Sequence, residues 1–96
     1  MIYTEILEQK MIKLAQEYAF DYFNLDNNDE RIPKYQKKRE LIQNTLLKME
    51  KEERLIIAFT FLFPENLTKL KAYYDSEIYE DKKNLALISF FRCLKD

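Results

Sequence analysis

Residues 52–64 read EERLIIAFTFLFP, and this stretch says most about the fold. Its apolar run from Leu55 to Phe63, interrupted only by Thr60, spans about nine residues, far fewer than the ~20 that cross a bilayer. A segment that is apolar nearly all round and ends at a proline is typical of a helix inside a domain core. We therefore expect residues 52–63 to form the central, most buried helix, and we expect no membrane-spanning segment.

Apolar residues recur at helical spacing on both sides of this stretch, and the alternation typical of strands is nowhere sustained. The polar run at residues 24–29 predicts the end of a first helix, and Pro33 predicts the start of a second. The sequence thus predicts an all-α fold, a compact five-helix bundle with a helix-turn-helix-like C-terminal half. The four further helices are expected at residues 4–23, 34–49 and 66–74, and from a start between residues 79 and 82 to residue 95.

The whole chain of 96 residues is expected to form one domain, because no linker, repeat or low-complexity segment divides it. Its expected parts are an N-terminal helix within residues 1–25, central helices within residues 34–63 and a helix-turn-helix-like unit at residues 65–96. Seven Tyr and seven Phe are enough to fill a core. Cys93, the one cysteine, is expected to pack as a small buried apolar side chain. The start of the chain lacks the pattern of a signal peptide, which favours a cytoplasmic location.

The composition argues against most classes of enzyme, since the chain contains no Gly, no His and no Trp. Loops that cradle phosphates need glycine. Ser-His and Cys-His nucleophile pairs and ordinary zinc or iron sites need histidine. The acids Glu50, Glu52 and Glu53 are better explained as charges at a helix start, because no nucleophile or base accompanies them. We expect a non-enzymatic chain with no catalytic residue, no cofactor and no bound metal.

The charges nearly cancel over the whole chain but are unevenly distributed. Residues 1–30 carry seven acids against two lysines, whereas residues 31–54 carry eight bases against four acids. Cations gain nothing from the dipole at a helix start, so the basic cluster at residues 34–39 is a candidate for holding phosphates or an acidic partner. A solvated helix face is the plainer interpretation of the same cluster.

Several segments have the sequence pattern of a helix that leads into a helix-turn-helix motif. They are KRELI at 38–42, LLxM at 46–49, EERLII at 52–57 and LTxLxxYYD at 67–75. On these segments residues 35–94 resemble the ArpU/RinA-like late transcriptional regulators of bacteriophages, relatives of the promoter-reading C-terminal region of sigma factors. The resemblance implies that residues 67–75 form the first helix of the motif, residues 76–78 its turn and residues 79–94 its recognition helix.

The expected recognition helix departs from the family pattern. It begins Tyr79-Glu80-Asp81, and acids repel phosphates, whereas base readout uses Arg, Lys, Asn or Gln. The DNA surface is therefore expected to be weakened or turned toward a protein. The candidate contacts to DNA or to a protein partner are Lys34, Lys37, Lys38, Arg39, Tyr79, Lys82, Lys83 and Arg92.

Three functions follow as hypotheses. The first is a small regulatory protein of a phage or mobile element, in the cytoplasm of a bacterial host cell. It would act on transcription by binding a regulator or polymerase protein, with DNA as a weaker partner. The second is a protein-binding inhibitor without DNA binding, of the anti-defence or anti-CRISPR type or like a bacteriocin-immunity bundle, as the acidic first third and the many tyrosines suggest. The third is a homodimer, through residues off the main apolar stripes that are expected to be exposed. These are Ile2, Tyr3, Phe20 and Tyr79.

Overall fold

The computed structural model describes residues 3–20, 25 and 28–95, and over these residues the chain has five α-helices and no strand. The predicted all-α fold is therefore confirmed. In chain order the elements are α1 (Tyr3–Ala19), α2 (Arg31–Leu47), α3 (Lys51–Ile57), the π-helical η2 (Ala58–Leu62), the 3₁₀-helical η3 (Pro64–Asn66), α4 (Leu67–Tyr73) and α5 (Ser76–Lys95).

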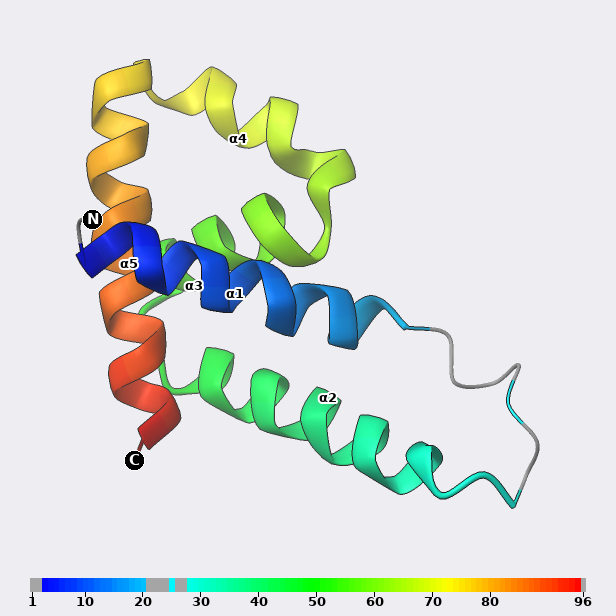
Figure 1. The fold of residues 1–96 in the computed structure, drawn as a ribbon. Helices are drawn as coiled ribbons and strands as arrows, with labels where there is room; N and C mark the ends of the chain where they lie inside the picture. The colour runs from blue at the N-terminus through cyan, green and yellow to red at the C-terminus, as the bar shows by residue number, and fades with distance from the viewer. Residues whose placement is uncertain (1–2, 21–24, 26–27, 96) are drawn as a thin grey trace.

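The central helix is α5, which packs against α1, α2 and α3 (Figure 1). Ala86, Leu87 and Phe90 on this helix have no solvent exposure. The expectation that residues 52–63 form the central helix is wrong, because α5 takes that place, although only Glu52 and Phe63 within that stretch are exposed. The physical reason is length: α5 has 20 residues, so that three helices can pack along it, whereas α3 and η2 together span only Lys51–Leu62.

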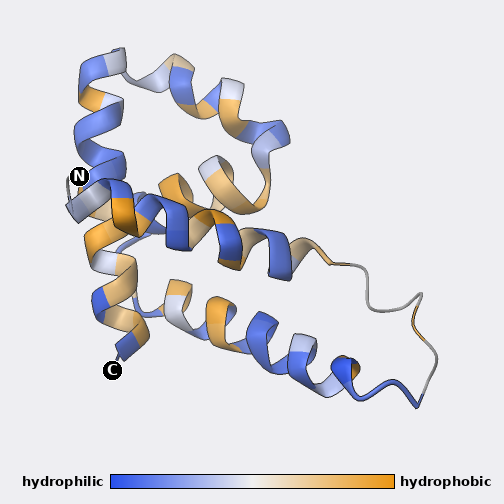
Figure 2. Ribbon diagram, viewed as in Figure 1, coloured by the Kyte–Doolittle hydropathy of each residue, from blue (hydrophilic) through white to orange (hydrophobic). Residues whose placement is uncertain are grey.

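Apolar side chains from every α-helix meet in one core. Figure 2 shows that they gather on α3, η2 and the C-terminal half of α5, while α2 and the first turns of α5 are largely hydrophilic. Cys93 is half-buried against this core. The buried apolar residues are Leu7, Met11, Ala15, Tyr18, Ile42, Met49, Ile56, Ile57, Leu62, Leu70, Tyr79, Ala86, Leu87 and Phe90.

The first helix ends earlier than the sequence predicts. α1 stops at Ala19, and the Phe20 N–H donates to the Glu17 carbonyl at 3.3 Å in a tight last turn. The Phe20 ring stacks on Tyr35 of α2 with the ring centroids 4.4 Å apart, so the first residue after α1 packs against α2. Residues 21–23, into which the predicted helix extends, lie outside the described residues.

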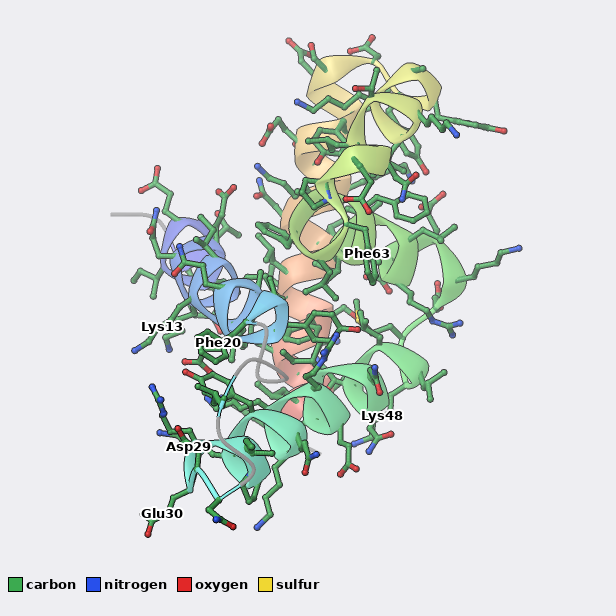
Figure 3. The ribbon with its side chains drawn as sticks, turned by 90° about the vertical axis from the view of Figure 1, so that its right-hand side faces the viewer. Lys13, Phe20, Asp29, Glu30, Lys48 and Phe63 are labelled. Atoms are coloured by element: carbon green, nitrogen blue, oxygen red, sulfur yellow. The ribbon has the colours of Figure 1, made fainter. Side chains whose placement is uncertain are left out.

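The second helix begins at Arg31, before the predicted start at residue 34. Asp29 determines this start, since its Oδ1 accepts the Arg31 N–H at 2.9 Å and its Oδ2 pairs with the Arg31 guanidinium at 2.8 Å. The hydrogen bonds from Arg31 lower the pKa of Asp29 to about 2. Pro33 still lies in the first turn, where a backbone N–H has no helical acceptor. Figure 3 shows Asp29 and Glu30 at this end of α2 and Lys48 at the other end.

The corner between α4 and α5 also differs from the prediction. Only Tyr74 and Asp75 separate the two helices, so residues 76–78 are the first turn of α5 and not a turn between helices. Asp75 starts α5 because its side chain accepts the Glu77 N–H at 3.1 Å and its carbonyl accepts the Tyr79 N–H at 2.8 Å. The predicted start between residues 79 and 82 is wrong, since an acid that looks like part of a loop is an N-terminal cap.

The apolar stretch changes its helical form after Ile57. In η2 the Phe63 N–H donates to the Ala58 carbonyl, five residues back, at 2.7 Å. This spacing is that of a π-helix, whereas an α-helix bonds four residues back. Thr60 in this segment faces α5, where its Oγ1 lies 2.6 Å from the Tyr79 hydroxyl. This hydrogen bond joins the π-helical segment to the central helix.

The substitution Tyr79→Phe is expected to lower the free energy of unfolding by about 1 kcal/mol, because it removes the Thr60 hydrogen bond and keeps the buried ring. Urea unfolding followed by circular dichroism measures the change. Tyr73→Phe is the matched control, since Tyr73 is exposed, and its stability should stay within about 0.5 kcal/mol of the parent chain. Equal stabilities of the two variants would contradict the assignment.

Candidate functional site

Two of the candidate contact residues are buried. Tyr79 is 4% exposed and Lys83 is 8% exposed, so neither can contact DNA or a partner as predicted. The reason is helical spacing, since Tyr79 and Lys83 lie about one turn apart on the same face of α5 as Leu87 and Phe90, which pack into the core. The same finding corrects the expectation that Tyr79 is exposed at a dimer interface.

Lys83 is satisfied inside the protein by two carboxylates. Its Nζ lies 3.1 Å from Glu8 Oε1 on α1 and 2.9 Å from Glu80 Oε2 on α5. Burial acts to lower the pKa of Lys83, but the hydrogen bonds to Glu80 and Glu8 outweigh it, so that pKa lies above its ordinary value. This ammonium group therefore joins α1 to α5 and is not available to a phosphate.

Three more of the candidate cations are engaged within the chain. The Lys38 Nζ lies 2.8 Å from Glu17 Oε2, a carboxylate oxygen without solvent access. The Arg39 guanidinium lies over the Tyr18 ring, 4.7 Å from its centroid. Lys82 pairs with Glu52 at 2.8 Å. These contacts join α2 to α1 and α5 to α3. The charged groups of Lys38, Arg39 and Lys82 are therefore already engaged within the chain.

The remaining candidates, Lys34, Lys37 and Arg92, are exposed. Lys34 and Lys37 lie near the start of α2, whereas Arg92 lies near the end of α5. Figure 1 shows the start of α2 on the opposite side of the molecule from α5. The structure therefore does not bring the predicted residues together into one basic surface.

The residues considered for a dimer interface differ in exposure and do not lie together. Tyr3 is exposed as predicted, whereas Phe20 is half-buried and stacks on Tyr35, and Ile2 lies outside the described residues. Figure 3 shows Phe20 at the end of α1, next to α2. Tyr3 begins α1 and Phe20 follows its end, so these two residues form no shared apolar patch that would favour a second copy.

A groove with a mostly apolar lining lies between α3–η2 and α4 and has a volume of about 540 Å³. One wall comes from α3 and η2 and the other from α4. The groove residues are Lys51, Glu52, Leu55, Phe59, Lys69, Leu70, Tyr73 and Tyr74. We call this surface the α3–α4 groove.

Tyr73 at this groove is 87% exposed, whereas its neighbour Tyr74 is half-buried. Tyr74 follows the last residue of α4 with an extended backbone, and its side chain takes the inner position. Its ring packs against the core, and its hydroxyl donates to Glu52 Oε2 at 3.2 Å. Tyr73 is therefore left without a covering element.

One end of the groove is held by a polar cluster of Glu52, Tyr74 and Lys82. Glu52 accepts hydrogen bonds from Lys82 at 2.8 Å and from Tyr74, and both lower the pKa of its carboxyl group. Burial and the hydrogen bond to Glu52 raise the pKa of Tyr74, and Glu52 raises that of Lys82. Glu52 is thus an ionised carboxylate whose charge is compensated by Lys82.

The charges on the two walls of the groove are not compensated. Lys51 on α3 and Lys69 on α4 are exposed, and neither forms an ion pair within the part of the chain that the structure describes. Because Lys82 already neutralises Glu52, the groove carries a net positive charge.

Sequence reasoning missed this groove, although one signal for it is present. The stretch from Leu55 to Phe63 is apolar on more faces than a single core contact needs. Ile56, Ile57 and Leu62 supply the core, whereas Leu55 and Phe59 are half-buried and line the groove.

Over the described residues, no helix combines the length and the hydropathy that a bilayer crossing demands. Over the same residues, no three or more acidic or thiol side chains are grouped in a way that could hold a metal ion. Comparison of this chain with protein-family models, curated proteins and solved structures found no match.

Proposed function

We propose that this chain is a small non-enzymatic regulatory protein that acts by binding another protein in the α3–α4 groove. The observation that carries the proposal is Tyr73, an aromatic side chain 87% exposed beside an apolar floor of Leu55, Phe59 and Leu70. Tyrosine is enriched at protein interfaces and among the residues that dominate binding energy. An exposed aromatic next to an open apolar groove is typical of such a site.

The distribution of cations favours a protein partner over DNA. DNA binding draws its strength from many Lys and Arg side chains that neutralise phosphates together. Here Lys38, Lys82 and Lys83 are paired with carboxylates of the chain itself. The transcriptional role implied by the resemblance, and the alternative role as an inhibitor, would both be exercised through a protein contact at the groove.

The substitution Tyr73→Ala is expected to reduce capture of the partner at least about tenfold, because truncation of a central interface aromatic costs on the order of 2 kcal/mol. The measurement is quantitative affinity capture from source cells, with mass spectrometry of the retained proteins. Leu47→Ala is the matched control, since Leu47 is 69% exposed on α2 and does not line the groove.

Both positions are exposed, so both variants should keep the stability of the parent chain within about 0.5 kcal/mol, which urea unfolding checks. A stoichiometric partner that is captured equally by both variants would contradict the proposal, and so would the absence of any such partner.

A further inference from the structure

We infer that the occupant of the α3–α4 groove is an amphipathic helix of the partner protein with acidic residues beside its apolar stripe. This inference rests on the proposed function and adds the chemistry of the partner to it. Its basis is the shape of the groove walls, the unpaired charge on the groove and the way in which the groove is held open.

The walls of the groove suit a helix. Leu55 and Phe59 lie four residues apart on one wall, and Leu70 and Tyr73 lie three residues apart on the other. Rows of side chains at these spacings form the ridges between which a further helix packs. A peptide in extended form would need free backbone donors and acceptors, whereas both walls are helices whose backbone groups are largely bonded internally.

The positive charge of the groove favours acidic residues on both sides of the apolar stripe of that helix. Lys51 and Lys69 stand on opposite walls without an ion pair in the described residues, and Lys82 already compensates Glu52. An apolar helix with acids on both sides would place a carboxylate near each lysine. Complementary charge of this kind steers association and selects among partners. A helix with basic flanks would be repelled.

Contacts within the chain hold the groove in place before any partner binds. Leu70 is the buried residue of α4, and the Tyr74–Glu52 hydrogen bond ties the end of α4 to α3. An occupant would cover Leu55, Phe59 and Tyr73, which the rest of the described chain leaves partly or largely exposed. A groove that is held before binding loses less conformational freedom when the partner docks.

The experiment is a selection of random 16-residue peptides displayed on phage against the immobilised full chain. Enriched peptides are then measured by fluorescence anisotropy. We expect apolar residues spaced i, i+3 or i+4, and i+7, flanked by Asp or Glu, and affinities that weaken at least about tenfold with Tyr73→Ala. The pair Lys51→Glu and Lys69→Glu should weaken binding about tenfold, and added salt should weaken binding to the parent chain.

The matched control is the pair Lys34→Glu and Lys37→Glu, which makes the same change of charge on α2 and should leave the affinity unchanged. Groove binders with neutral or basic flanks, or equal effects of the two charge-reversal pairs, would overturn the inference and leave the proposed function standing. Peptides indifferent to Tyr73→Ala, or no enriched peptide, would overturn both. Light scattering that shows a dimer of the parent chain and a monomer of Tyr73→Ala would instead assign the groove to a second copy.

Discussion

The substitution Phe90→Ala is expected to lower the free energy of unfolding by about 3–5 kcal/mol, because it removes a large aromatic side chain and leaves a cavity. Phe90 has 0% exposure on α5, the helix that three others cover, and its ring packs edge-on against Phe91 with centroids 5.2 Å apart. Domains of this size are stable by only about 5–15 kcal/mol, so the variant should lose a large fraction of its stability. The midpoint of urea unfolding, followed by circular dichroism, measures the loss.

Leu85→Ala is the control for this prediction. Leu85 lies on the same helix but is 62% exposed, so its truncation should change the stability by less than about 0.5 kcal/mol. A loss at Leu85 equal to that at Phe90 would contradict the placement of α5 at the centre of the core.

Removal of the carboxylates around Lys83 is expected to have the second largest effect. The double variant Glu8→Gln and Glu80→Gln leaves a buried ammonium group without a negative partner, which should cost about 2 kcal/mol. The cost stays below the ~3–5 kcal/mol of a fully buried pair because Glu80 is more than half exposed. Lys83→Met, in contrast, removes the charge and keeps the length of the side chain, so it should change the stability by less than about 1 kcal/mol.

The pH dependence of the Lys83 contribution follows from its raised pKa. A group that holds its proton more tightly in the folded state stabilises the fold at every pH below its unfolded pKa of 10.5. The contribution is then lost as the pH rises through the folded pKa. The stability of the parent chain should therefore fall relative to Lys83→Met above about pH 10.5, while tyrosine ionisation affects both proteins alike. Urea unfolding at several pH values measures the difference, and a constant difference up to about pH 12 would contradict the prediction.

The helices themselves could be predicted because their signals are local. The spacing of apolar residues within a few turns predicts each helix, and Pro64 predicts the end of the apolar stretch. Helix ends were less predictable, since the same residue types serve in turns and in caps. Asp75 illustrates this, because its side chain bonds to the Glu77 N–H and starts α5 where the sequence suggests a turn.

The candidate contact residues could be predicted less well than the helices. A lysine is ordinarily a surface residue, and nothing near Lys83 in sequence shows that Glu8, 75 positions away, reaches it from α1. The groove was missed for a similar reason, because α3 and α4 create it jointly. Only their packing shows which aromatic is covered, Tyr74, and which is left outside, Tyr73.

The spacing of apolar residues is sufficient to derive the all-α fold, because this spacing is a property of residues that are close together in the sequence. Contacts between segments far apart in the chain determine three other features. These are the burial of Tyr79 and Lys83, the position of α5 at the centre and the positively charged α3–α4 groove. Such contacts decide which of several similar helix faces is covered, and a face left uncovered looks the same in sequence as one that is buried.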